Sequence, residues 1–513
     1  MSLPNVLFIL ADDLGYGDVG ANNPESRIPT PHLDRLAAAG MRFTNAHASA
    51  AQCSPTRYSI MTGRYPWRSR LKTAVLRHFD TPLLDVERET LASLFKAQGY
   101  ATAGIGKWHL GLGWQAKPGH SFDPDSWDPE QVHAIDFTKP LTDSPLDHGF
   151  DTYFGLNASN NMLPYCFIEN DRVVKVPEKT KYPVFDTESK DMPVSDDYVS
   201  RNLDQLLLGK ALDWMDDHLQ TDPDQPFFLY FPSSAIHRPC LPTDEFVGRS
   251  DAGLRGDKVA ELDAIVGTLM DALETHGVAD NTIVIFTSDN GALPGDLEDA
   301  IQTLADNEYG SPWQPERLLA WKGQEQEEGL YARWLTYDHR SCGPYRGYKG
   351  NVYDGGHRVP CLVRWPGRVP AGRVEDETIC LTDFMATFAA LFDADLPDNV
   401  AEDSYNLLPL LLGRKPEHPV REATICQSWW GVKCIYKGPW KLIVGNGKDG
   451  IHYEKGDASP MQLYHIVDDA GETRNVCDQH AEVVAELTAL LEKACRDERS
   501  APPIRFAVSP TVT

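Results

Sequence analysis

Continuous apolar segments recur along the chain, with amphipathic or polar segments between them. The clearest apolar segments are residues 5–10, 226–232 and 282–287. Each has the length and composition of a strand that is buried on both faces. Helical periodicity and helix end signals occur at residues 30–37, 89–98, 203–219, 257–276 and 383–392. Helices that alternate with fully apolar strands predict an α/β fold in which helices sandwich a large, mostly parallel sheet.

The C-terminal part of the chain has a different pattern. Residues 433–436 and 440–443 are short extended segments joined by Lys-Gly-Pro, and residues 481–495 are helical. This order predicts a smaller α+β domain with an antiparallel sheet and a closing helix. Because 513 residues exceed the size of one ordinary core, we divide the chain at a polar run near residue 415, into domains 1–415 and 416–513.

Two regions have no clear period. Residues 111–195 are rich in proline, aspartate and aromatic residues, and we expect long loops there that wall a pocket. An insertion at residues 293–341 carries four large aromatic residues, which are Trp313, Trp321, Tyr331 and Trp334. These side chains either pack the insertion locally or form a wall on which a sugar stacks.

Charge and cysteine usage exclude several classes of protein. A net charge of −27 argues against nucleic-acid binding through a basic surface, and no apolar run approaches membrane-spanning length. The ten cysteines form no Cys-x-x-Cys pairs, so their spacing indicates neither a zinc cluster nor a disulfide framework. An apolar strand begins at residue 5 with no charged leader before it. We therefore expect a cytoplasmic protein, or a periplasmic or secreted one from which a signal peptide has been removed.

Polar residues follow the predicted strands at the points where the strands end. They are Asp12, Asp13, Lys107, His109, His237, Asp289 and Asn290. Each alone is also a common turn or strand-end residue, but ligands of α/β sheets bind at the carboxyl ends of the strands. Two neighbouring aspartates and the pair Asp289-Asn290 offer only oxygen ligands, which suit one hard divalent cation, calcium in preference to magnesium, and not zinc.

A helix is predicted to begin at Cys53, in the run Cys-Ser-Pro-Thr-Arg, and to end at Gly63. A lone cysteine in a large chain is most often an inert packing residue. At a helix start, however, the helix dipole and Arg57 one turn below both favour negative charge on the atom that Cys53 presents. This is a setting typical of a nucleophile.

The pattern Cys-x-Pro-x-Arg at residues 53–57, followed by Thr-Gly-Arg at 62–64, resembles the signature of type I sulfatases, which belong to the alkaline phosphatase superfamily. Further segments resemble motifs of arylsulfatase-A-like members in the same order, at residues 106–111, 148–151, 288–291, 346–349, 353–360 and 462–475. One departure is Asp354, where the family usually has glutamate. The resemblance covers most of the chain.

What the resemblance implies is a sulfuric ester hydrolase in which a maturating enzyme, either a formylglycine-generating or an anaerobic sulfatase-maturating one, oxidises Cys53 to formylglycine. The hydrated aldehyde is a gem-diol, which together with Asp12, Asp13, Asp289 and Asn290 binds the cation. One of its hydroxyls, near Arg57, ionises and attacks sulfur.

The same resemblance assigns roles to four further residues. Lys107 and Lys349 hold the sulfate oxygens, and His237 protonates the leaving alcohol. His109 then takes a proton from the remaining hydroxyl, which expels sulfate and regenerates the aldehyde. The implied substrate is a sulfated small molecule or glycan, and a glycan is favoured over a steroid or lipid.

Two other functions fit the same residues. Some members of the superfamily with the same modified cysteine hydrolyse phosphonate or phosphate diesters, although Lys107 and Lys349 resemble the sulfatase pattern. The second alternative is an inactive sulfated-glycan binder, which follows if Cys53 remains a thiol.

Overall fold

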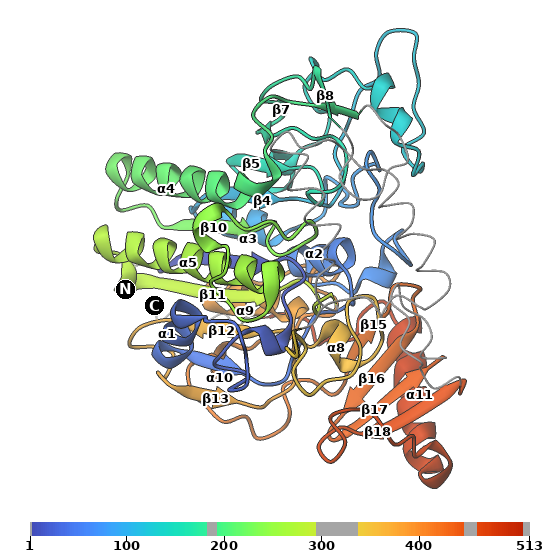
Figure 1. Ribbon diagram of the computed structural model, residues 1–513. Coiled ribbons are helices and arrows are strands. Elements are labelled where there is room, and N and C mark those ends of the chain that lie inside the picture. The colour runs from blue at the N-terminus through green and yellow to red at the C-terminus, as the bar shows by residue number, and fades with distance from the viewer. Residues whose placement is uncertain (1–2, 182–191, 294–336, 446–458, 506–513) are drawn as a thin grey trace, which may run out of the picture.

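The computed structural model describes residues 3–181, 192–293, 337–445 and 459–505, and Figure 1 shows their arrangement. The four large aromatic residues of the predicted insertion lie outside these ranges. Across the described ranges, every helix falls short of the length or the apolar character that a bilayer span requires.

A ten-stranded sheet forms the centre of the molecule, with the strand order β13-β2-β12-β11-β1-β10-β4-β5-β6-β7. The strands are β1 (Asn5–Ala11), β2 (Met41–Phe43), β4 (Ala101–Lys107), β5 (Thr152–Leu156), β6 (Ile168–Glu169), β7 (Arg172–Val173), β10 (Phe227–Pro232), β11 (Thr282–Ser288), β12 (Cys361–Arg364) and β13 (Arg373–Glu375). The five strands from β11 to β5 are mutually parallel, and antiparallel pairs occur toward both edges. The predicted α/β fold with a mostly parallel sheet is confirmed.

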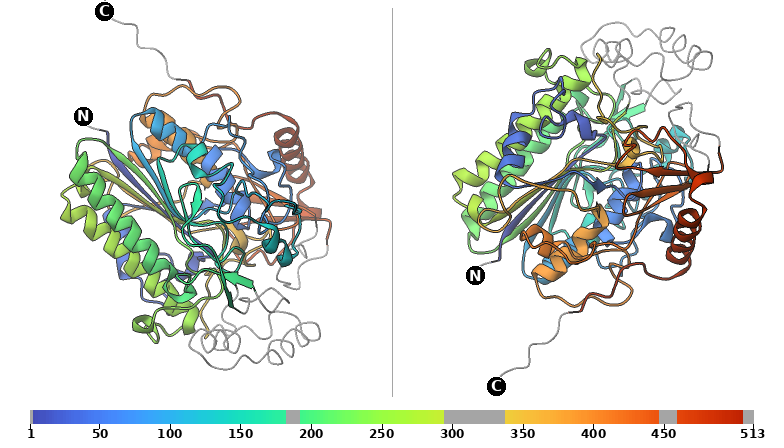
Figure 2. Two further views of the ribbon diagram at one scale, coloured as in Figure 1. Left: turned by 90° about the horizontal axis from the view of Figure 1, so that it is seen from above. Right: turned by 90° about the horizontal axis from the view of Figure 1, so that it is seen from below.

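Helices cover both faces of this sheet, as the two views of Figure 2 show. One face carries α1 (Pro31–Ala39), α4 (Leu203–Thr221) and α5 (Gly253–Thr275), and the other carries α2 (Cys53–Thr62), α3 (Leu91–Ala97) and α9 (Phe384–Leu391). Phe95 of α3 stacks on Phe228 of β10 with 4.2 Å between ring centroids, and it also contacts Phe388 of α9 at 4.7 Å. Burial of such aromatic side chains is the main force that holds the helices on the sheet.

The region predicted as long loops contains three unexpected strands of the main sheet, which are β5, β6 and β7. The longest of them is β5. Its sequence is short and includes Gly155, which weakens the apolar signal of a strand. A Cβ atom at position 155 would lie 1.7 Å from the carbonyl oxygen of Gly106 in the neighbouring strand β4. Glycine is therefore needed here because two backbones approach closely, and this requirement obscured the strand in the sequence.

The C-terminal residues form an antiparallel sheet with the order β15-β16-β17-β18, seen in orange and red in Figure 1. The strands are β15 (Thr424–Gln427), β16 (Lys433–Lys437), β17 (Trp440–Val444) and β18 (Met461–His465), and helix α11 (Ala481–Arg496) packs on them. Ile435 and Leu442 of the sheet share a buried apolar cluster with Leu487 and Leu491 of the helix. The division at residue 415 stays a prediction.

The C-terminal sheet is held to the rest of the chain by backbone pairing near Ala50 and by the buried charge of Lys441. Gln427 of β15 forms a bridge with Ala50, and the amide of Ala51 donates to the carbonyl of Gln427 at 2.8 Å. The fully buried Lys441 contacts Asp354 at 2.8 Å and Glu472 at 2.6 Å. These contacts fix the segment that leads directly into Cys53.

Candidate active site

The site lies where the parallel strands end, and the start of α2 faces it. Strand β1 leads into Asp12 and Asp13, and β11 leads into Asp289 and Asn290. Lys107 is the last residue of β4 and His109 follows it, while His237 lies five residues beyond the end of β10. Lys349 comes from a loop before the four-residue helix α8 (Asp354–His357). The carboxyl ends of the strands thus converge as the topology predicts.

Helix α2 places Cys53 at its first position, after Gln52 in an extended conformation. The helix ends at Gly63, which is left-handed with φ of 64°. Cys53 is 1% exposed, and its Sγ lies 3.5 Å from Asp12 Oδ1. Burial raises the pKa of the Cys53 thiol to about 12, although Lys107 and Lys349 lower it.

For the thiol, the penalty of burying a charge outweighs the stabilisation of negative charge that we expect from Arg57 and the helix dipole. The Arg57 guanidinium donates to Asp289 Oδ2 at 2.8 and 3.0 Å and to the Lys107 carbonyl at 2.9 Å, so its charge is already matched. As a thiol, Cys53 is a poor nucleophile in this position.

The four predicted ligands and Cys53 come together in the fold. One ligand atom from each of Asp12, Asp13, Cys53 and Asp289 lies within 4.8 Å of the others, and all four residues are buried. Asn290 donates from Nδ2 to Asp13 Oδ1 at 2.8 Å, which leaves its Oδ1 buried without a hydrogen-bond partner among the described residues. An unsatisfied amide oxygen beside three carboxylates fits a hard divalent cation.

Three cations face the three carboxylates at short range. Besides the pair of Arg57 and Asp289, Lys107 Nζ lies 2.6 Å from Asp12 Oδ2. Lys349 Nζ lies 2.6 Å from Asp13 Oδ1. Burial opposes ionisation of Asp13, but Lys349, His237 and Lys107 hold its pKa below the ordinary value. The formal charges sum to zero, so a bound divalent cation would leave the site with a surplus of two positive charges, which favours an anionic ligand.

Two hydrogen-bond acceptors next to one ring nitrogen orient His237. Its Nδ1 lies 2.8 Å from the Arg238 carbonyl and 3.2 Å from Asn160 Oδ1. Because a carbonyl oxygen only accepts, we assign the neutral tautomer with hydrogen on Nδ1. Nε2 is then free to exchange a proton, and it lies 3.8 Å from Asp13 Oδ2. Burial and the charge of Lys349 hold the pKa of His237 well below its usual range, although Asp13 raises it.

His109 is fixed in a similar way. Its Nε2 lies 3.0 Å from the Leu76 carbonyl, so we assign hydrogen to Nε2. Its Nδ1 is buried and has no hydrogen-bond partner within the ranges that the structure describes. Burial, with the charge of Lys107 added, holds the pKa of His109 well below its usual range. The ring therefore presents an unprotonated Nδ1 with an unused lone pair.

Two supporting residues were missed from the sequence. Asn160 contacts His237, and Arg255 donates to the carbonyl of Asp13 at 3.3 Å while it pairs with Asp18 at 2.7 Å. Asn160 stands in the region expected to be loops, and Arg255 lies in the first turn of α5, before the point where the periodic pattern predicted the helix. Neither position carries a signal that sequence spacing reveals.

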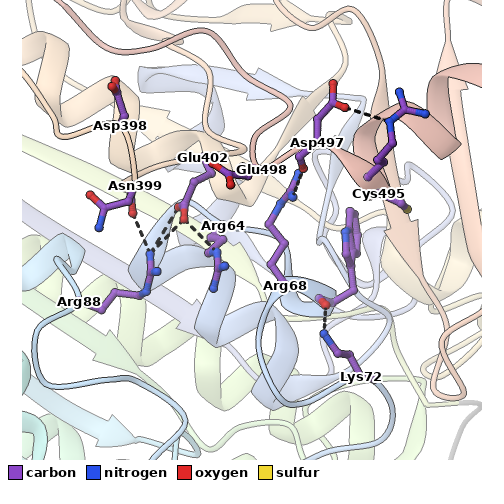
Figure 3. Close-up of a pocket in the computed structure, with 12 residues that line it drawn as sticks. Arg64, Arg68, Lys72, Arg88, Asp398, Asn399, Glu402, Cys495, Asp497 and Glu498 are labelled. Atoms are coloured by element: carbon purple, nitrogen blue, oxygen red, sulfur yellow. Dashed lines mark hydrogen bonds and ion pairs between the residues drawn. The ribbon is translucent and has the colours of Figure 1, made fainter.

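A cavity of about 570 Å³ lies at the other end of α2 (Figure 3). Arg64 and Arg88 line it and both contact Glu402, at 3.0 and 3.3 Å, while Arg68 pairs with Asp403 at 2.8 Å. The arginines of this cavity are thus already matched by carboxylates, and none of the predicted site residues lines it. The convergent strand ends, and not this cavity, form the candidate active site.

Family models match most of the chain. The model described as "Sulfatase" matches residues 4–394, and the model "N-sulphoglucosamine sulphohydrolase, C-terminal" matches residues 347–497.

Individual relatives are similar over nearly the whole length. An N-acetylgalactosamine-6-O-sulfatase of Bacteroides thetaiotaomicron is 32% identical, covering 95% of this chain and 92% of its own. Arylsulfatase A of Bos taurus is 31% identical, covering 94% and 85%. A sulfatase structure from work on glycosaminoglycan metabolism by Bacteroides thetaiotaomicron superposes with a TM-score of 0.76 at 30% identity, over 96% of this chain and 99% of that one.

Proposed function

The chain belongs to the sulfatase family and is a sulfuric ester hydrolase, and we propose that the ester it hydrolyses is carried by a carbohydrate. Support for the substrate class comes from relatives that are named for N-acetylgalactosamine 6-sulfate, in Bacteroides thetaiotaomicron and in Homo sapiens. The observation that carries the mechanism is the meeting of Cys53, three carboxylates, three cations and two oriented histidines in one buried site.

The family implies a divalent metal, and we propose calcium. Asp12, Asp13, Asp289 and Asn290 would hold it through oxygen atoms, and residue 53 would add a ligand once its sulfur is replaced by oxygen. A thiol whose pKa is raised to about 12 does not serve a hard cation, so the oxygen-containing form of residue 53 completes the set better than cysteine does.

When both are present, the formylglycine at residue 53 and the cation supply an activated hydroxyl nucleophile for attack on sulfur. Arg57 holds Asp289 through two hydrogen bonds and braces the first turn of α2 against the Lys107 carbonyl. Its function in this proposal is to fix the positions of residue 53 and of the carboxylates, so that the nucleophile is aligned before substrate binds.

Lys107 and Lys349 are assigned to the sulfate oxygens. Their carboxylate partners Asp12 and Asp13 are also the proposed cation ligands. With the cation bound, these carboxylates would neutralise less of the lysine charge, so the two ammonium groups would attract a bound anion more strongly. Both ammonium groups are nearly fully buried, where charge acts more strongly than in water. They would offset the negative charge that develops in the transition state.

The histidines are assigned to opposite ends of the reaction. His237 Nε2 would give its proton to the leaving alcohol, and the negative charge of a bound sulfate ester would raise the depressed pKa of this ring toward the protonated form. His109 Nδ1, which has no partner in the described ranges, would accept the proton in the step that releases sulfate. Asn160 would keep the His237 ring in the productive orientation.

The test compares two leaving groups. A nitrophenolate leaves with little protonation, whereas a sugar alkoxide needs a proton, and such transfer contributes about 10²–10⁴-fold. His237→Ala should lower kcat/KM for a sugar 6-sulfate far more than for nitrophenyl sulfate. His276, whose side chain is 21% exposed and pairs with Asp216 on the surface, provides the matched control, and His276→Ala should leave both values unchanged.

Equal losses with both substrates in folded His237→Ala protein would remove His237 from the acid role. A panel of sulfated mono- and disaccharides, with released sulfate measured, tests the substrate class. Turnover of nitrophenyl sulfate without turnover of any sulfated sugar would contradict the carbohydrate assignment.

A further inference from the structure

A second group of potential metal ligands lies outside the active site, at the junction between the two sheets. It consists of His47, in the short strand β3 (Ala46–His47), His357 of α8, and Cys426 of β15. All three are buried, and one ligand atom from each lies within 4.8 Å of the others. Sequence spacing gave no sign of such a cluster, because its members are separated by 69 to 379 positions in the chain.

The hydrogen bonds of the two histidines fix their tautomers. His47 Nε2 lies 2.9 Å from Asn45 Oδ1, and the amide nitrogen of Asn45 donates to Thr378 at 2.6 Å, which leaves its oxygen to accept. His357 Nε2 lies 3.0 Å from the Val352 carbonyl. Both Nε2 atoms therefore carry hydrogen, and both Nδ1 atoms present lone pairs.

These two Nδ1 atoms face each other at 3.1 Å. Two lone pairs at that distance repel unless a cation lies between them, either a shared proton or a metal ion. Zn–N bonds of about 2.0–2.1 Å place two ligand nitrogens of one ion at about this separation. A ligating histidine also typically donates its other N–H to a carbonyl or amide oxygen, which is the role of Val352 and Asn45 here.

The charges around the cluster distinguish between a shared proton and a metal ion. The charged groups around the cluster are Asp354, Glu472, Lys441 and Arg358, which are linked by contacts of 2.6 to 3.0 Å. Their formal charges sum to zero when Glu472 is ionised and to one positive charge when it is protonated, so in either case a shared proton would add one uncompensated charge to a buried site. Cys426 and Cys434 stand directly opposite each other in β15 and β16, and Cys434 Sγ lies 3.7 Å from His357 Nε2. Two thiolates would neutralise a divalent ion.

We propose that His47, His357 and Cys426 bind a zinc ion, with Cys434 as the neighbouring thiol that supplies the second negative charge. Imidazole and thiolate ligands suit zinc and do not suit the hard cation of the active site. The ion would tie β3, α8 and β15 together and so fasten the C-terminal sheet to the segment that runs from His47 to Cys53. Its role would be structural and separate from hydrolysis.

Cobalt substitution tests the site in the full-length chain. The experiment uses reduced Cys53→Ala protein, because this change removes the active-site thiol as a source of a thiolate–cobalt signal. Added Co²⁺ should give thiolate-to-cobalt charge-transfer absorption, and added Zn²⁺ should abolish it. The absorption should be lost in Cys53→Ala/Cys426→Ser and kept in Cys53→Ala/Cys361→Ser, a matched change of another fully buried cysteine.

A second measurement needs no change at the site. Cysteine alkylation in mild denaturant, followed by peptide mass spectrometry, should show Cys426 protected when Zn²⁺ is present and Cys361 unaffected by it. If Cys426 is alkylated equally with and without Zn²⁺, or if the cobalt absorption persists in the Cys426→Ser protein, the proposed site does not exist.

Discussion

Replacing Lys441 with methionine should destabilise the protein far more than replacing any exposed lysine. The Lys441 side chain is fully buried, and its Nζ lies 2.8 Å from Asp354 Oδ1 and 2.6 Å from Glu472 Oε1. At an effective dielectric constant near 20, the attraction of Lys441 to each carboxyl group in its ionised form amounts to about 6 kcal/mol, and the desolvation of the ions opposes it by several kcal/mol each. Removal of one partner from such a group costs about 3–5 kcal/mol, because the other charges stay buried.

This loss should depend on pH. Burial and the charge of Asp354 raise the pKa of Glu472 to about 8, against the pull of Lys441. A carboxyl group whose pKa is raised on folding loses stability as pH rises from its unfolded pKa to its folded one, at about 1.4 kcal/mol per unit. Without Lys441 the folded pKa moves higher still, so the variant should continue to lose stability above pH 8, where the wild type no longer does.

Urea unfolding at pH 7 and pH 9, followed by tryptophan fluorescence, measures both effects. Lys437→Met is the matched control in the adjacent strand, since Lys437 is 38% exposed and pairs with the exposed Glu486, and it should cost less than about 1 kcal/mol. Adding Glu472→Gln to Lys441→Met should remove the pH dependence. Equal losses for Lys441→Met and Lys437→Met at pH 9 would refute the reasoning.

Two further predictions concern the active site. Peptide mass spectrometry of active protein should show formylglycine at residue 53, with sulfur and two hydrogens exchanged for one oxygen; activity in protein that contains only the thiol would contradict the mechanism. Exhaustive chelation should abolish activity and calcium should restore it, whereas Asp289→Ala should bind no calcium, since it removes one of the three carboxylates. Full activity after chelation, or calcium binding by Asp289→Ala, would argue against the cation site.

Much of the fold is readable from the sequence because its central strands are buried on both faces. Strands β1, β10 and β11 are continuous apolar runs, and their observed ends agree closely with the predicted ones. Strand β5 was missed because Gly155 avoids a backbone clash and does not supply apolar surface. Burial can be inferred from composition, whereas close approach of two backbones cannot.

In the candidate site, too, some features could be inferred from the sequence and others could not. Asp12 and Asp289 were placed together because parallel strands end at one edge, which is a property of topology. The pairing of Lys107 with Asp12, and the brace from Arg255 to the carbonyl of Asp13, depend on side-chain directions between residues far apart in the chain. No local pattern encodes such directions, so sequence reasoning named the residues that converge at the strand ends but not the contacts that hold them.

The burial of Cys53 limits the time that is available for its proposed modification. A modifying enzyme cannot reach a side chain that is 1% exposed, so the proposed conversion of Cys53 to formylglycine would have to precede the closing of the sheet around it. Closure requires Lys349, which leaves the ribosome about 300 residues after Cys53, or roughly 15–60 s later at typical rates of synthesis. Specific activity should therefore reflect a race between maturation and folding, and slower translation between these two residues should yield a larger active fraction.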